Sequence, residues 1–426
     1  MQLALASILL SVLVLIFSPA LSFAQQRLDL GELLAEAMEN NPELKAMRER
    51  VNALDARAKA EGALDDPTLK VELEDLSTDR PLSISPDDAM LTRYTFSQMF
   101  PFPGKRGLRE RIAGKEASAA RAELSSRELE IASMLKEAFF EYAFLDDSIR
   151  VNRGIKDLLA DAVRIAETRY SVGQAPQQDI LKLNVEQAMI TNEIIGLEAE
   201  RSVSAAMLKT LLSRPQTLEL SAPGEMPKAQ IDFDLNALTE KALGTNPDVL
   251  MFQAEAEAGE LGEELAGKNY YPDFMVGVAP IQRDNRFDNF DLMFQVNIPL
   301  WRGKYGSLER EARANAKAAR LRLLSMKNGK AFEIKRAAVQ VEAAQRTREL
   351  YDTTLLPQVE LSYQSALRNY QAGTIDLLTL LDTERELRKT RVEYLRAILE
   401  YNRRIAALER AAGVELRPTG VAKRSE

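Results

Sequence analysis

The 426-residue chain contains neither cysteine nor histidine. Without cysteine there is no disulfide, no thiolate nucleophile, no cysteine–zinc site and no cysteine to carry a lipid. Without histidine, the commonest general base and the commonest transition-metal ligand are both missing. No catalytic or nucleotide-binding motif stands out either. The sequence therefore predicts no enzyme and no cofactor, although an enzyme that uses only carboxylates stays open as a weaker alternative.

Basic residues also do not cluster in long runs anywhere along the sequence. The net charge is −8, and no run of five or more basic residues occurs. Nucleic-acid binding is therefore not expected. Beyond the first residues, no apolar run is long enough to form a membrane-spanning helix, which needs about 20 residues.

The first residues resemble an export signal. Leu3 to Phe17 is apolar but shorter than a spanning helix, and Ser22-Phe23-Ala24 has the small-x-small pattern of a cleavage site. We predict that residues 1–24 are a signal peptide, although no lysine or arginine precedes the apolar stretch. An uncleaved N-terminal anchor is the alternative.

The chain carries a long internal repeat. Three landmarks recur 205 residues apart: Asp29-Leu30 at Asp234-Leu235, Asn41-Pro42 at Asn246-Pro247, and Asp66-Pro67 at Tyr271-Pro272. Such a spacing is far longer than the 20–50 residues of solenoid repeats. We therefore expect two related halves, residues 25–225 and 226–415, followed by a flexible tail over 416–426.

Each half combines short strands with very long helices. Residues 69–74 alternate between apolar and charged side chains, which indicates a strand with one apolar face and one solvated face. Strands are expected at about 68–76, 91–100, 273–280 and 291–299, with a polar loop over 281–290 between the last two. A proline-free stretch from Lys105 to about Arg169 and a helix-forming stretch from about Ser307 to Asn369 predict helices of about 100 Å at 1.5 Å per residue. A break is expected in the second helix at Pro357.

The last helix has coiled-coil spacing. Apolar residues fall seven apart at Leu380, Leu387, Tyr394, Tyr401 and Leu408. Ile398 and Ile405 add the second core position of the heptad, and Glu384 and Arg391 interrupt it.

Four strands cannot close a barrel alone, and open sheet edges are not tolerated in lipid. Three chains would give twelve strands, an even number within the range of outer-membrane barrels. In that arrangement the apolar side chains face lipid. The polar side chains expected to face the lumen are Lys70, Glu72, Glu74 and Arg93. A soluble sheet with one buried face predicts the same alternation and is the alternative.

The duplicated Asn-Pro motif and the paired turns Tyr170-x-x-Gly173 and Tyr370-x-x-Gly373 resemble the TolC family of outer-membrane efflux channels, over residues 27–415. The turn at Phe102–Arg106 is similar to the branch that serves heavy-metal pumps. The resemblance implies a mainly α protein with a small β part. It would form a homotrimer in the outer-membrane lipid of a Gram-negative bacterium, with a twelve-stranded barrel above a long periplasmic helical tunnel.

The resemblance also implies partners, a periplasmic adaptor and an inner-membrane RND-type pump, and no catalytic, cofactor or metal site. The channel would be the passive exit duct of this tripartite system. The turns at Gly173 and Gly373 would dock the adaptor. The candidates for the periplasmic gate are Asp179, Arg368, Tyr370, Asp376 and Asp382.

Two positions depart from the family pattern. Ile375 occupies the position of an arginine that would hold the gate closed through polar bonds, and Thr379 occupies the position of an acid. Arg368 or Asp376 is the expected substitute. Helix N-caps are the alternative explanation for Asp179 and Asp376, a solvated surface charge for Asp382, and packing at a helix end for Tyr370. A periplasmic coiled-coil scaffold or adaptor without a barrel is the alternative for the whole protein. The cargo, whether metals, drugs or other molecules, cannot be derived from these residues.

Overall fold

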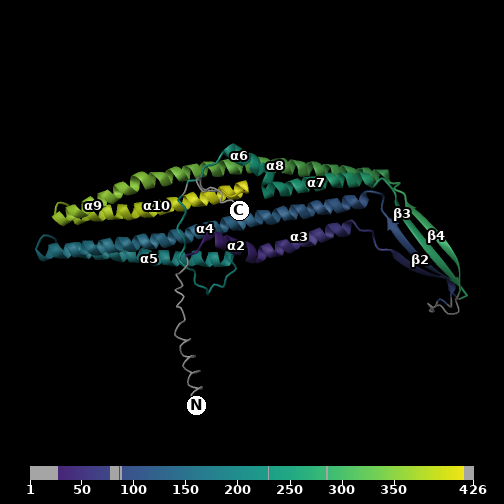
Figure 1. The fold of residues 1–426 in the computed structure, drawn as a ribbon, viewed down its shortest axis with the longest axis horizontal. Coiled ribbons are helices and arrows are strands. Elements are labelled where there is room, and N and C mark those ends of the chain that lie inside the picture. The colour runs from purple at the N-terminus through teal and green to yellow at the C-terminus, as the bar shows by residue number, and fades with distance from the viewer. Residues whose placement is uncertain (1–26, 77–85, 87–88, 229, 285, 417–426) are drawn as a thin grey trace, which may run out of the picture. The chain divides into compact units, whose positions relative to one another are not determined.

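The computed structural model describes residues 27–76, 86, 89–228, 230–284 and 286–416 (Figure 1). The expected signal peptide, residues 1–24, lies outside the described residues, as does the expected tail beyond residue 416. Within the described part, the chain is mainly helical with a small antiparallel sheet, which confirms the expected fold at this level. The elements are α2 (Leu30–Asn40), α3 (Pro42–Glu61), β1 (Thr68–Leu76), β2 (Ala89–Phe100), α4 (Lys105–Ser171), α5 (Gln177–Leu211), α6 (Leu235–Thr245), α7 (Pro247–Lys268), β3 (Asp273–Arg283), β4 (Arg286–Asn297), α8 (Arg302–Leu350), η2 (Tyr351–Leu355), α9 (Leu356–Ala372) and α10 (Leu377–Ala412).

The chain divides into two compact units. The first contains the chain up to Glu36, Leu135–Pro227 and Leu350–Leu399. The second contains Ala37–Met134, Lys228–Glu349 and the chain from Glu400. Each unit therefore takes residues from both of the expected halves, because the long helices α4 and α10 contribute to both units.

The first unit is built from α5, α9 and the adjoining parts of α4 and α10. Its core contains Ile155 and Leu159 of α4, Leu183 and Ile190 of α5, and a larger apolar set from the other helices. Leu380 and Leu387 are both 1% exposed, so these two heptad positions of α10 face this core. None of the helices in the described part of the chain is apolar enough over a sufficient length to cross a membrane.

A short π-helical segment, η2, stands where the sequence predicted a break at Pro357. It covers Tyr351–Leu355, and α9 begins at Leu356. Proline has no N–H to donate and its ring crowds the preceding turn. A single wide π turn accommodates this without ending the helical path.

In the second unit, the two Asn-Pro motifs each begin a helix. Asn41 accepts hydrogen bonds from the backbone N–H of Glu43 (2.9 Å) and Leu44 (3.3 Å). Asn246 likewise accepts from the N–H of Asp248 (2.9 Å). Both asparagines have extended backbones, as expected before proline, and the prolines occupy the first helical turn. The motif is thus a helix start at both positions.

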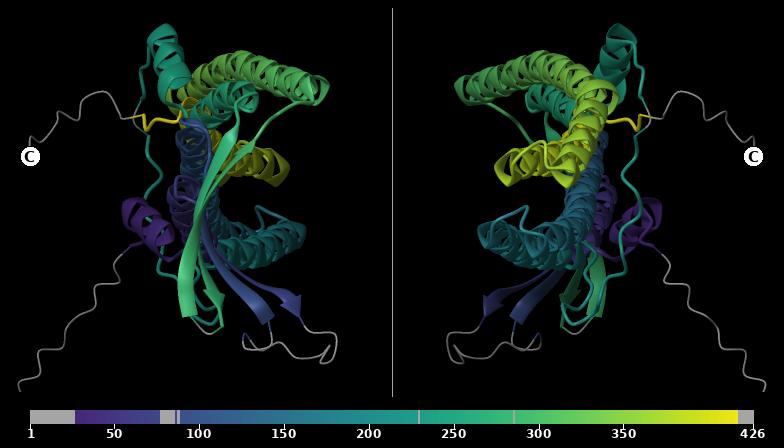
Figure 2. Two further views of the ribbon diagram at one scale, coloured as in Figure 1. Left: turned by 90° about the vertical axis from the view of Figure 1, so that its right-hand side faces the viewer. Right: turned by 90° about the vertical axis from the view of Figure 1, so that its left-hand side faces the viewer.

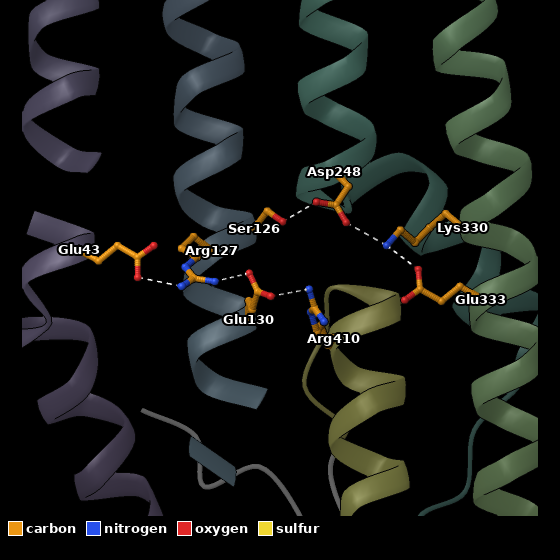
Figure 3. Close-up of polar contacts among 8 residues, drawn as sticks. All are labelled: Glu43, Ser126, Arg127, Glu130, Asp248, Lys330, Glu333 and Arg410. Atoms are coloured by element: carbon orange, nitrogen blue, oxygen red, sulfur yellow. Dashed lines mark hydrogen bonds and ion pairs between the residues drawn. The ribbon is translucent and has the colours of Figure 1, made fainter. Parts of the chain in front are cut away.

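The acid after each Asn-Pro motif binds a cation on a long helix (Figure 3). Glu43 accepts from Arg127 of α4 (2.8 Å), and Asp248 accepts from Lys330 of α8 (2.9 Å). Each cation also pairs with a glutamate three residues further on: Arg127 with Glu130 (2.6 Å) and Lys330 with Glu333 (2.8 Å).

The second copy of this arrangement is the more buried one. The Lys330 side chain is 7% exposed, against 29% for Arg127. Burial opposes ionisation of Asp248, but hydrogen bonds from Ser126 and Lys330 outweigh it and keep the pKa of this carboxyl below its usual value.

The sheet has the order β1-β2-β3-β4, with antiparallel neighbours. β1 and β4 are its edges, and the strands twist and curve together (Figure 2). The register aligns four exposed apolar residues on one face, Leu69, Phe96, Val278 and Leu292. Since side chains alternate across a strand, the intervening polar residues lie on the other face.

The β3–β4 hairpin differs from the expected polar loop over 281–290. Arg283 pairs with Arg286, so the strands continue almost to the turn, and a bulge lies between Ile281 and Gln282. β4 accordingly begins at Arg286 rather than about 291. Phe287 lies against Tyr94, with ring centroids 5.8 Å apart, a contact between β4 and β2 that strand-by-strand reasoning did not anticipate.

Candidate functional site

The two Tyr-x-x-Gly turns, both in the first unit, have the same backbone geometry. Gly173 and Gly373 have φ of +74° and +77°, in the left-handed region that glycine tolerates best. Each glycine N–H bonds the tyrosine carbonyl three residues back, at 3.0 Å and 3.1 Å. The next N–H bonds the carbonyl five residues back. This is the Schellman helix ending, which explains why glycine stands three residues after the tyrosine.

Arg169, in the last turn of α4, bonds both turns. Its Nη1 donates to the carbonyl of Tyr370 (2.8 Å) and its Nη2 to the carbonyl of Gln174 (3.2 Å). The guanidinium carbon also lies 4.8 Å from the centre of the Tyr370 ring, within the range of a cation–π contact.

Tyr370 is fully buried between these partners. Its hydroxyl donates to Oδ2 of Asp179, in the first turn of α5 (3.4 Å). Burial and the Asp179 carboxylate raise the pKa of Tyr370, so the hydroxyl keeps its proton. We call Arg169, Asp179 and Tyr370 the turn site. An open pocket of about 530 Å³ adjoins it, lined also by Lys182 and Asp376.

The structure separates the expected roles of the two aspartates. Asp376 precedes α10 and accepts from the Thr379 N–H (2.9 Å) and hydroxyl (2.6 Å), which is a helix N-cap. These hydrogen bonds from Thr379 lower the pKa of Asp376. Pro176, not Asp179, occupies the N-cap of α5, so capping does not account for Asp179.

The remaining gate candidates are not brought together with the turn site. Asp382 is exposed, and its nearest cation is Arg385, at 3.8 Å on the same helix. Arg368 is also exposed, and it has no ion pair among the residues that the structure describes. Ile375 packs against the apolar core of the first unit.

Arg169 is the functional residue that the sequence reasoning missed. The expected substitutes, Arg368 and Asp376, both lie near Ile375, whereas Arg169 belongs to the other turn. The available signal was its place directly before Tyr170, as the basic residue in the last turn of α4.

In the second unit, the polar residues of the sheet share one face. Glu72 pairs in register with Arg93, whose side chain bonds Glu74 and lies 3.5 Å from Asp291 of β4. Lys70 bonds Glu72. Within the described residues, no group of three or more histidine, cysteine, aspartate or glutamate side chains could hold a metal ion.

Comparison with known proteins places this architecture in a family. The model of the outer membrane efflux proteins matches residues 33–214 and again 238–414. The chain belongs to the outer membrane efflux protein family. The two matched stretches together cover most of the chain. They confirm the expected relationship and, at the level of the family, a role in outer-membrane efflux.

Relatives and solved structures agree with this membership. The cobalt-zinc-cadmium resistance protein CzcC of Cupriavidus metallidurans is 23% identical over 397 residues, covering 91% of this chain and 90% of CzcC. The pyoverdine export outer membrane protein OpmQ of Pseudomonas aeruginosa is 23% identical over 390 residues, covering 84% and 79%.

Among solved structures, VceC of Vibrio cholerae has a TM-score of 0.74 at 20% identity, covering 91% of this chain and 96% of VceC. CusC has a TM-score of 0.76 at 16% identity, covering 90% and 92%. These two structures support the fold of this family member.

Proposed function

We propose that the protein is the passive exit duct of a tripartite efflux system, located in the outer membrane of a Gram-negative bacterium. The observation that carries this proposal is the sheet. It exposes an apolar face, has polar side chains on the other face, and leaves β1 and β4 as open edges. Open edges expose unpaired backbone groups, which lipid does not tolerate.

Three chains close such a sheet into twelve strands, with β4 of one chain pairing with β1 of the next. The apolar face then contacts lipid, and Lys70, Glu72, Glu74 and Arg93 line the lumen. The long helices extend into the periplasm as a tunnel, whose inner end is formed by the turns at Gly173 and Gly373. These turns dock a periplasmic adaptor, which links the duct to an inner-membrane RND-type pump.

The turn site restricts the resting tunnel. Arg169 and the Tyr370–Asp179 hydrogen bond join α4, α5 and α9, so opening must break these contacts. Three copies of the exposed Asp382 add a ring of negative charge that attracts cations. Asp376 caps α10, and Arg368 is free to bind a neighbouring subunit. Metal cations are the first cargo to test, because CzcC is named for metal resistance.

The test has two stages. The expressed protein is expected to fractionate with the outer membrane, to require detergent, and to measure as a trimer by light scattering. Release by a salt wash as a water-soluble monomer would refute the duct and favour the periplasmic scaffold.

Single-channel conductance in planar bilayers then tests the turn site. Tyr370→Phe and Arg169→Gln are expected to increase conductance, because each removes a bond between helices. Tyr170→Phe is the matched control and is expected to leave conductance unchanged. Equal conductance in all four proteins would exclude the turn site as the gate.

A further inference from the structure

One carboxyl group in the first unit is buried without a hydrogen bond. Glu384 of α10 is 0% exposed, and neither of its carboxylate oxygens has a hydrogen-bond partner. An ionised carboxylate in such a place is costly unless it is paired and hydrogen-bonded. The sequence shows the same anomaly, because Glu384 interrupts a heptad core position.

Charged groups from two helices surround Glu384. Arg388 Nε lies 3.7 Å from its carboxylate, but the Arg388 side chain is shared with Glu193 and with Glu186, at 3.5 Å. Arg385 bonds Glu186 at 2.6 Å. We call Glu186, Glu193, Glu384, Arg385 and Arg388 the Glu384 cluster. Its three acids face two cations, and the exposed Asp382 also lies 3.8 Å from Arg385. The five cluster residues are therefore neutral together only when one acid carries a proton.

The other two helices of the unit supply further groups. The Tyr363 hydroxyl of α9 is also buried without a hydrogen-bond partner, and it interacts electrostatically with Glu384, with Asp161 of α4 and with Arg391 of α10. Arg391 is itself paired with Glu360 of α9 at 2.8 Å. Among the residues that the structure describes, each of the arginines Arg385, Arg388 and Arg391 is therefore also paired with an acid other than Glu384.

We propose that Glu384 is a proton-binding site that controls how tightly α10 packs against α5 beside the turn site. With the proton bound, the cluster is neutral and the helices stay packed. Without it, an unsolvated negative charge faces Glu186 across the α5–α10 contact, and opening this contact brings the carboxylate to water. This inference rests on the proposed function, since it requires these helices to border the tunnel entrance.

The electrostatics of the site support this direction. Burial, the largest effect, raises the pKa of Glu384 from 4.5 to about 7; Arg388 opposes the rise and Glu186 adds to it. A carboxyl exposed to water by opening would return toward its ordinary pKa. Raising the pH therefore favours the open form, by up to about tenfold per pH unit between the two pKa values.

Two measurements on the intact protein test the proposal. Infrared difference spectra between pH 5 and pH 9 are expected to show a protonated carboxyl band that titrates near pH 7 and disappears in Glu384→Gln. The matched control is Glu386→Gln, an exposed acid on the same helix, which should keep the band. Absence of the band in the wild type, or its persistence in Glu384→Gln, overturns the proposal.

Bilayer recordings provide the second readout. Open probability of the wild type is expected to rise between pH 5 and pH 7.5, and that of Glu384→Gln to stay at its low-pH value. If wild type and Glu384→Gln conduct with the same pH response, the proposal for Glu384 is wrong, but the proposed function as an exit duct is unaffected. If neither conducts at any pH, the duct itself is wrong, and the infrared titration alone decides proton binding.

Discussion

Tyr170 and Tyr370 occupy the same position in two turns with the same backbone geometry, yet Tyr170 is 47% exposed and Tyr370 is 0% exposed. Both turns have the Schellman ending and the glycine. Their side-chain contacts differ: the first turn and the start of α5 supply Arg169 and Asp179, and the second turn supplies the tyrosine that both contact. The same local backbone therefore serves two turns whose side chains have different roles, and one turn is the partner of the other.

The largest expected effect comes from removing the buried ring. Tyr370→Ala should lower the free energy of unfolding by about 3–5 kcal/mol, because it leaves a cavity and frees Asp179 and Arg169. Tyr170→Ala should stay within about 0.5 kcal/mol, as for other exposed sites. Urea unfolding of the detergent-solubilised protein, followed by helical circular dichroism, measures both. Equal losses would mean that the two turns are equivalent after all.

The duplicated acid–cation pairs offer a second comparison. Lys330→Met leaves the half-buried Asp248 without the cation that is hydrogen-bonded to it and should cost about 3 kcal/mol. Arg127→Met, at the more exposed copy, should cost about 1 kcal/mol. The same unfolding measurement applies, and a larger loss for Arg127→Met would contradict the burial argument.

Glu384 has a counterpart in the first hairpin, since Asn184 follows Gly173 at the spacing at which Glu384 follows Gly373, and Asn184 is exposed. The folded pKa of Glu384, about 7, lies above its unfolded value of 4.5. The folded state therefore binds the proton more tightly, and stability falls as the pH rises between these values. Glu384→Gln should remove this loss and raise stability at pH 8 by up to about 3 kcal/mol.

At pH 4 the same substitution should have little effect, because the wild-type carboxyl is then protonated in both states. Asn184→Glu places an acid at the exposed counterpart and should leave the pH profile unchanged. Unfolding free energies from pH 4 to pH 8 measure all three proteins. A pH profile of Glu384→Gln that parallels the wild type would show that Glu384 is not the titrating group.

The smallest expected effect lies in the turn glycines. Gly173→Ala and Gly373→Ala should each cost about 1–2 kcal/mol, because alanine disfavours a positive φ. An added Cβ would meet nothing within 4 Å at Gly173 but would lie 3.4 Å from Arg169 Nη2 at Gly373. Only Gly373→Ala should therefore change conductance as well as stability. A change of conductance in Gly173→Ala but not in Gly373→Ala would contradict this prediction.

Much of the fold could be predicted from short sequence patterns. The Tyr-x-x-Gly helix ends and the mainly helical class follow from preferences within a few residues. The polar hairpin expected over 281–290 was wrong, because Phe287 and Phe290 extend the pairing of β4 with β3. Pairing energy from a neighbouring strand outweighed the local polarity of this segment.

The candidate site was less predictable. Tyr370 and Asp179 lie 191 residues apart in the chain and still share a hydrogen bond. The sequence named both, but it could not show that Arg169, rather than Arg368, bonds Tyr370. Likewise, Asp376 and Asp179 have similar places after their turns, and only the structure shows that the first caps a helix and the second binds the tyrosine.

The sequence by itself determined the mainly helical class, the approximate places of the long helices and of the four strands, and which family the chain resembles. Local backbone preferences and the alternation of side chains are sufficient for these features. Only the tertiary structure decided which tyrosine is buried, which arginine reaches it, and that Glu384, which interrupts the heptad pattern of the last helix, is buried away from solvent. These depend on desolvation and on partners about 200 residues away, which no local pattern encodes.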